Sequence, residues 1–137
     1  MKFKKMSEPI VKTYIKEGIT DFFLNHHFEV EDLGEGVLLV THFDEIPVFV
    51  KAESGNLFFE VDLGNIIELG ATDKLFEILD LNTEILPVSF GINNTNPEDP
   101  RLVLLESRQT ANLKDHELLG VFDALEIALD RAEELLS

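Results

Sequence analysis

Hydrophobic residues recur with helical spacing at both ends of the chain. Apolar pairs return every four residues over residues 7–25, which predicts an amphipathic helix there. Near the C-terminus, apolar residues return at spacings of four and three, which predicts a longer helix over residues 112–137. Asn112 is expected to cap this helix, because Asp115 three residues later completes a pattern that resembles a capping box.

Between these helices, short hydrophobic segments are separated by turn residues. Each segment is rich in branched or aromatic side chains, which favour strands. The turns are too short for crossover connections, so consecutive strands must pair antiparallel. The pattern therefore predicts a meander of three or four strands. They are expected at residues 28–33, 37–43, 48–52 and 57–63.

A short third helix is predicted after the meander. Thr72 or Asp73 can cap it, and it should end near Leu81. Its apolar residues are expected to face the core: Leu75, Phe76 and Leu79.

Two more strands complete the pattern, at residues 85–92 and 101–108, and a polar loop joins them. The order predicts an α+β fold, in which helices at the N- and C-terminal ends flank an antiparallel five- to six-stranded sheet. The chain has 137 residues, close to the commonest domain size, and 45% are hydrophobic. We expect a single domain over residues 1–137 with one sizeable core.

The charge is strongly acidic and unevenly distributed. The net charge is −16, yet residues 1–16 hold five lysines against one glutamate, so the remainder carries −20. Direct nucleic-acid binding requires a basic surface, which residues 17–137 lack. The lysines fit a solvated tail and the outer face of the first helix, while contact with an anionic membrane stays open. They are Lys2, Lys4, Lys5, Lys12 and Lys16.

The chain contains no cysteine and no apolar run of the ~20 residues that a transmembrane helix needs. Disulfides and a thiol nucleophile are therefore excluded. We expect a soluble, cytoplasmic protein.

Few residues suggest chemistry, and no catalytic, metal or cofactor motif is present. Glu60 and Asp62 fall on one face of a predicted strand, where they could form an acid/base pair or a divalent-cation site. A solvated sheet face explains the same pattern. The histidines lack the spacing of a metal site. They are His26, His27, His42 and His116.

The apolar stripe of the last helix is the most regular in the chain. A helix of this length would extend about 37 Å, which can exceed the width of the sheet beneath it. An uncovered part would favour contact with a partner or a second copy, whereas full cover would place the whole stripe in the core. The candidate interface residues are Leu118, Phe122, Leu125 and Leu129.

Three segments resemble the uncharacterised bacterial YjfI family of small acidic proteins. They are VLLV at residues 37–40, EIPVF at 45–49 and LPVSFGI at 86–92, with the acidic closing helix in addition. Members of that family are encoded beside a homologue of the phage-shock membrane-maintenance protein. The resemblance therefore implies a connection with envelope stress or membrane maintenance, and it implies no catalytic residue.

The order of elements also resembles the class I type III secretion chaperones, which are small, acidic, dimeric and bind extended segments of client proteins. We therefore expect a non-enzymatic binding or adaptor protein. It would be a homodimer that offers apolar grooves to an unknown protein partner, and its acidic surface would favour a basic one. The alternative is a carboxylate-based or metal-dependent enzyme that uses Glu60 and Asp62.

Overall fold

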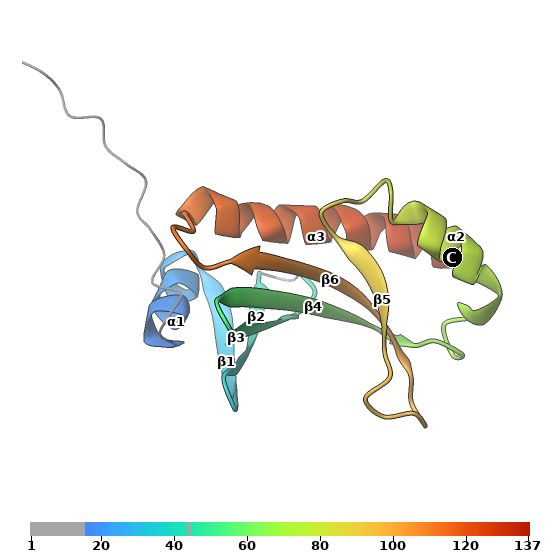
Figure 1. The fold of residues 1–137 in the computed structure, drawn as a ribbon, viewed down its shortest axis with the longest axis horizontal. Coiled ribbons are helices and arrows are strands. Elements are labelled where there is room, and N and C mark those ends of the chain that lie inside the picture. Colours follow the sequence, from blue (N-terminus) through green and yellow to red (C-terminus); the bar gives the residue numbers. More distant parts are fainter. Residues whose placement is uncertain (1–15, 44) are drawn as a thin grey trace, which may run out of the picture.

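The fold is seen in a computed structural model that describes residues 16–43 and 45–137. Helices stand at both ends of a six-stranded sheet (Figure 1). The helical elements are α1 (Lys16–Asn25), the 3₁₀ turn η1 (Thr72–Lys74), α2 (Leu75–Leu81) and α3 (Asp115–Leu136). The strands are β1 (Phe28–Gly34), β2 (Val37–His42), β3 (Val48–Glu53), β4 (Asn56–Asn65), β5 (Ser89–Asn93) and β6 (Arg101–Gln109).

The sheet is antiparallel throughout, with strand order β1-β2-β3-β4-β6-β5. Short turns join the first four strands, as antiparallel neighbours require. Between β3 and β4, Ser54 and Gly55 both have positive φ angles, of 51° and 79°. Two positive φ angles in succession match the right-handed twist of a hairpin, and glycine adopts one of them without strain.

One face of the sheet carries the helices (Figure 1). α3 crosses that face lengthwise, α1 packs beside β1, and α2 contacts α3. Side chains therefore alternate along β4: Leu57, Phe59 and Val61 are buried, whereas Phe58 is exposed and Glu60 is half-buried. Among the described residues, no helix covers the opposite face.

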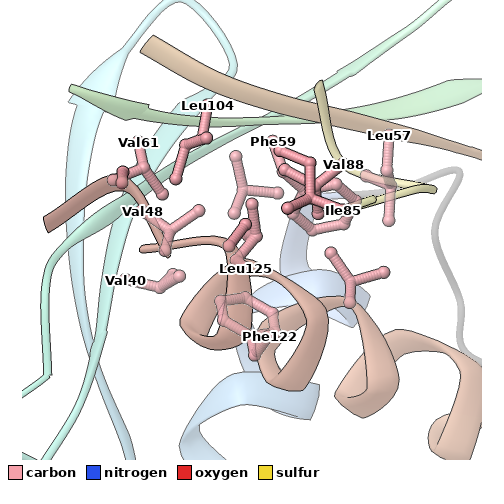
Figure 2. Close-up of a cluster of buried hydrophobic side chains, with 14 of the residues drawn as sticks. Val40, Val48, Leu57, Phe59, Val61, Ile85, Val88, Leu104, Phe122 and Leu125 are labelled. Atoms are coloured by element: carbon pink, nitrogen blue, oxygen red, sulfur yellow. The ribbon is translucent and has the colours of Figure 1, made fainter. Parts of the chain in front are cut away.

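The core lies between α3 and the sheet (Figure 2). Phe122 of α3 is its aromatic centre, because its ring lies 5.5 Å from that of Phe23, 4.9 Å from Phe28 and 5.8 Å from Phe59. All three contacts are edge-on, the geometry that ring quadrupoles favour. Phe122 thereby joins α1, β1 and β4 to the last helix.

The predicted α+β architecture is confirmed, and the meander strands lie where the turn pattern placed them. The described part of the first helix is also as predicted, with Ile19, Phe22 and Phe23 buried. Its expected beginning at residues 7–15, and the lysines before it, lie outside the described residues. The predicted strand at 85–92 is shorter than expected: Ile85 and Val88 are buried in the connection that precedes β5.

The expected inward face of the short helix is wrong. Leu75, Phe76 and Leu79 are exposed, while Ile78 and Leu81 are buried. Five of the seven residues of α2 are apolar, so large apolar side chains lie on both of its sides. Periodicity alone therefore cannot select the side that faces the core.

The predicted start and cap of the last helix are also wrong. α3 begins at Asp115, and its N-cap is Lys114, whose backbone is extended and whose side chain makes no capping hydrogen bond. Asn112 lies before the helix with a φ of 57°. This left-handed backbone explains the difference, because an N-cap residue ordinarily has the extended backbone that Lys114 adopts.

The stripe of α3 is covered by the sheet over most of its length. Buried residues continue along it from Leu118 to Ala132, and Leu135 and Leu136 pack against the edge of the core. At 22 residues the helix extends about 33 Å. The described residues include no helix long and apolar enough to cross a membrane.

Candidate functional site

A groove runs along one side of α3, above the ends of β2 and β3. A straight helix on a twisted sheet touches the strands along its centre and diverges from them at its flank. The floor of the groove is apolar, with Val40 and Val48 from the strands and Phe122 and Leu125 from the helix. Its volume of about 390 Å³ lies within the usual range for ligand pockets.

The rim of the groove is acidic. Glu126, Asp130 and Glu133 line it from α3, and Glu45 lines it from the connection between β2 and β3. No lysine or arginine is among the described residues that line it. His42 also contributes, with Nδ1 3.7 Å from a carboxylate oxygen of Glu45. A bound segment would therefore meet an apolar floor beneath a row of carboxylates.

A second pocket continues the groove toward the C-terminus. Its volume is about 310 Å³, and it shares Ile46, Leu129 and Glu133 with the first. Together the two pockets follow α3 from Phe122 to Leu136, a distance of about 21 Å at the rise of an α-helix. We call this surface the α3 groove. It can accommodate several residues of an extended or helical segment.

The four candidate interface residues separate into two groups. Leu118 is completely buried and lines neither part of the groove. Phe122, Leu125 and Leu129 come together in its floor, although the first two are also core residues. Whether they contact a partner stays a prediction.

The candidate interface residues predicted from the sequence did not include the acidic rim of the groove. Glu126, Asp130 and Glu133 have the i, i+4, i+7 spacing of one helix face. That face lies beside Leu125 and Leu129. The helical spacing of acidic residues next to the apolar stripe could therefore have indicated the rim. Glu45 and Ile46 carried no such signal, because only folding brings the connection between β2 and β3 to α3.

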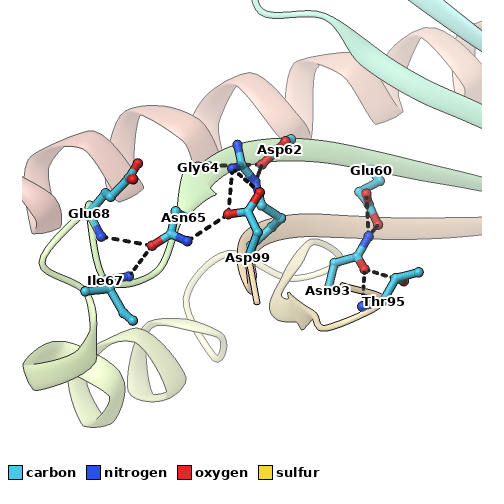
Figure 3. Close-up of polar contacts among 10 residues, drawn as sticks. Glu60, Asp62, Gly64, Asn65, Ile67, Glu68, Asn93, Thr95 and Asp99 are labelled. Atoms are coloured by element: carbon cyan, nitrogen blue, oxygen red, sulfur yellow. Dashed lines mark hydrogen bonds and ion pairs between the residues drawn. The ribbon is translucent and has the colours of Figure 1, made fainter. Parts of the chain in front are cut away.

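Glu60 and Asp62 lie on the same face of β4, as predicted, but each has a separate partner (Figure 3). A carboxylate oxygen of Glu60 accepts a hydrogen bond from Nδ2 of Asn93 at 3.2 Å. Asp62 pairs with Nε of Arg101 at 3.1 Å. They lie on the face without helices, away from the α3 groove. Their arrangement is that of a network which attaches β4 to neighbouring segments.

Asp99 and Arg101 extend this network. Oδ1 of Asp99 accepts hydrogen bonds from Asn65 at 2.7 Å and from Arg101 at 3.2 Å. These bonds hold the pKa of Asp99 below its ordinary value, and the carboxylates of Asp62 and Asp99 raise the pKa of Arg101. Both groups therefore keep their charges at neutral pH, which suits a structural ion pair rather than proton transfer.

The described residues contain no group of three or more histidine, cysteine, aspartate or glutamate side chains that could hold a metal ion. His42 and Phe28 stack with ring centres 4.4 Å apart. His26 lies 3.8 Å from Asp115 across the α1–α3 contact. These two histidines thus belong to separate packing contacts.

Comparison with solved structures identifies the architecture. The type III secretion chaperone SpcU, in its heterodimeric complex with ExoU from Pseudomonas aeruginosa, is similar with a TM-score of 0.68 and 17% identity; the match covers 87% of this chain and 98% of that one. SycH, a type III secretion chaperone of Yersinia pestis in complex with a fragment of YscM2, is similar with a TM-score of 0.56 and 18% identity. This match covers 85% of this chain and 94% of that one. The fold is chaperone-like.

The same fold extends to a protein of a different description. YbjN of E. coli, described as a candidate transcription regulator, matches with a TM-score of 0.60 and 9% identity over 95% of this chain and 92% of that one. No family model matches the chain, and no curated protein matches its sequence. The resemblance to the YjfI family therefore gains no support from a sequence family. At these identities the structural neighbours establish the fold alone.

Proposed function

We propose that this protein is a non-enzymatic binding or adaptor protein whose α3 groove holds a basic, amphipathic segment of another protein. The observation that carries this proposal is an apolar floor beneath a rim of four carboxylates, with no lysine or arginine among the described residues of the lining. The neighbouring SpcU and SycH structures support it, because both are complexes with other proteins.

The groove suggests how a segment would bind. Large apolar side chains would enter the floor around Leu125 and Leu129, where they lose contact with water. Lysine or arginine side chains beside them would reach Glu126 and Asp130. The net charge of −16 would also accelerate encounter with a basic partner and repel nucleic acid.

The proposed cellular setting has three parts. The protein would act as a homodimer, it would work in the cytoplasm, and it would serve envelope or membrane maintenance. The last part rests on the resemblance to the YjfI family. It is tested by deleting the gene and measuring growth under envelope stress, where unchanged growth would remove this part of the proposal and leave the groove unaffected.

Reversing the charge of two rim residues is expected to weaken recognition of basic segments at least tenfold. The probe is a fluorescent peptide that alternates leucine and lysine, compared with its leucine–glutamate counterpart by fluorescence anisotropy. The wild-type protein should bind the lysine peptide, and added salt should weaken binding by screening the charges. The variant Glu126→Lys/Asp130→Lys should bind it at least tenfold more weakly, because two attractive charges become repulsive.

A matched control is available on the same helix. Asp123 and Glu134 are exposed on α3 and line neither part of the groove. The variant Asp123→Lys/Glu134→Lys changes the net charge equally and should bind the peptide nearly as well as wild type. Equal weakening in both variants would show that overall charge, and not the groove, determines binding. That result would overturn the proposal.

A further inference from the structure

We infer that the chain's own N-terminal segment, residues 1–15, occupies the α3 groove and competes there with the basic segment of a partner. Residues 1–15 precede the part of the chain that the structure describes. Their sequence matches the chemistry of the groove, and their attachment to α1 places the groove within their reach. The inference rests on the proposed function and adds its regulation, because a partner would have to displace this segment before it could bind.

The segment has the composition that the groove would select in a partner. It contains four lysines and one glutamate, so it carries a charge of +3 in a chain whose net charge is −16. Large apolar side chains recur among the lysines, and they could enter the apolar floor that Val40, Val48, Phe122 and Leu125 form (Figure 2). These apolar residues are Phe3, Met6, Ile10, Val11, Tyr14 and Ile15.

The rim of the groove needs positive charge that the described residues do not bring to it. Four carboxylates line the rim, and like charges so close together repel one another. All three arginines of the chain instead pair with carboxylates outside the groove, and Lys51 pairs with Glu53 at 3.5 Å. The lysines of residues 1–15 are therefore the largest remaining source of positive charge for the rim.

The segment can reach the whole groove from its attachment to α1. α1 lies at one end of the groove, because the ring of Phe23 is 5.5 Å from that of Phe122 on the floor. The segment joins α1 at Lys16, which is about 10 Å from Phe23 at the rise of an α-helix. Fifteen extended residues span up to roughly 50 Å, whereas the groove follows α3 for about 21 Å.

Covalent attachment makes this competition effective even for a weakly binding segment. A segment held by a short tether has an effective concentration of about 1 mM at its site. If the same segment bound as a free peptide with a Kd of about 100 μM, it would fill roughly nine grooves in ten. The apparent Kd of a partner would then rise about tenfold, because only the unoccupied fraction can bind it.

Carbodiimide cross-linking of the wild-type chain tests the occupancy, because this reagent joins a lysine amine to a carboxylate only where the two are in contact. Mass spectrometry should find lysines of residues 1–15 linked to Glu126 or Asp130. It should not find them linked to Asp123, which is exposed on α3 and lines neither part of the groove. Excess leucine–lysine peptide should remove the links. In an equal mixture of isotopically labelled and unlabelled chains, each link should join residues of the same isotopic form.

Charge reversal in the segment tests the competition. Lys4→Glu/Lys5→Glu should tighten binding of the leucine–lysine peptide at least threefold in the anisotropy assay, because a segment that the rim repels leaves the groove open. The control Lys51→Glu/Lys114→Glu changes the net charge equally at residues that line neither part of the groove. It should tighten binding less than the segment variant does. Circular dichroism should show the native fold in both variants.

The outcomes separate this inference from the groove proposal. Absence of links to the rim, or equal tightening in both lysine variants, would overturn the inference and leave the groove proposal intact. Links found only between different isotopic forms would overturn it as well, because the segment would then occupy another molecule. Rim links in a protein that binds the leucine–lysine peptide neither as wild type nor as Lys4→Glu/Lys5→Glu would support the occupancy and overturn the groove proposal.

Discussion

Replacing Phe122 with alanine is expected to lower the free energy of unfolding by about 3–5 kcal/mol. Phe122 is only 8% exposed, and its ring contacts the rings of Phe23, Phe28 and Phe59. The substitution would remove three edge-on aromatic contacts and leave a cavity among rings from three other elements. Urea denaturation followed by circular dichroism should show a lower midpoint with an unchanged slope.

Two further variants make this test specific. Phe122→Leu loses the ring contacts but fills most of the cavity, so it should lower the free energy of unfolding by less than Phe122→Ala does. Phe43→Ala is the same chemical change at a residue that is 68% exposed, and it should alter stability by less than about 1 kcal/mol. Equal effects of alanine at positions 122 and 43 would mean that Phe122 is not a centre of the core.

The dual position of Phe122 limits how the α3 groove can be probed. Phe122 and Leu125 line the floor and also hold α3 on the sheet, so replacing them would alter stability and binding together. The rim carboxylates Glu126 and Asp130 are exposed, and their replacement should preserve the fold. Rim variants therefore report on binding, and floor variants report on stability.

The fold was accessible from the sequence because its signals are local. Strands separated by short turns must form antiparallel hairpins, and Gly55 already marked the tight turn between β3 and β4. The stripe of α3 is regular over 22 residues, which leaves only one face that can be buried. The polar loop after β5 joins it to β6, and these two strands pair antiparallel with each other.

The α3 groove and the exposed side of α2 depend on contacts between distant segments. The groove exists because Ile46, in a connection, approaches Leu129 on the last helix. The exposed side of α2 is set by which of its apolar residues reach the core, and only tertiary packing selected Ile78 and Leu81. Local sequence patterns therefore predict neither the approach of Ile46 to Leu129 nor the side of α2 that faces the core.

Replacing Glu106 with glutamine is expected to stabilise the protein by about 1–2 kcal/mol at neutral pH. Glu106 lies on β6 opposite Phe59, on the face that α3 covers, and is only 5% exposed. Oε2 accepts a hydrogen bond from Nε of Arg108 at 3.2 Å, whereas Oε1 is buried and has no partner among residues 16–43 and 45–137. Burying a charged carboxylate oxygen without a hydrogen-bond partner costs free energy. Glutamine removes the charge while keeping the shape of the side chain.

The pH dependence of this effect identifies its cause. Burial raises the pKa of Glu106 above its ordinary value of 4.5, although the bond from Arg108 opposes the shift. The native state therefore binds this proton more tightly than the unfolded chain, and stability falls as pH rises through the raised pKa. Below the ordinary pKa both states are protonated, so the advantage of Glu106→Gln should be small there and should grow toward neutral pH.

Urea denaturation of wild type and Glu106→Gln at several pH values measures this difference. Removing any acidic charge also relieves the repulsion within a protein of net charge −16, so a control for charge is needed. Glu77→Gln provides it, because Glu77 carries the same charge on an exposed helix position. A gain of the same size at both positions, or one independent of pH at position 106, would show that burial of Glu106 is not the source.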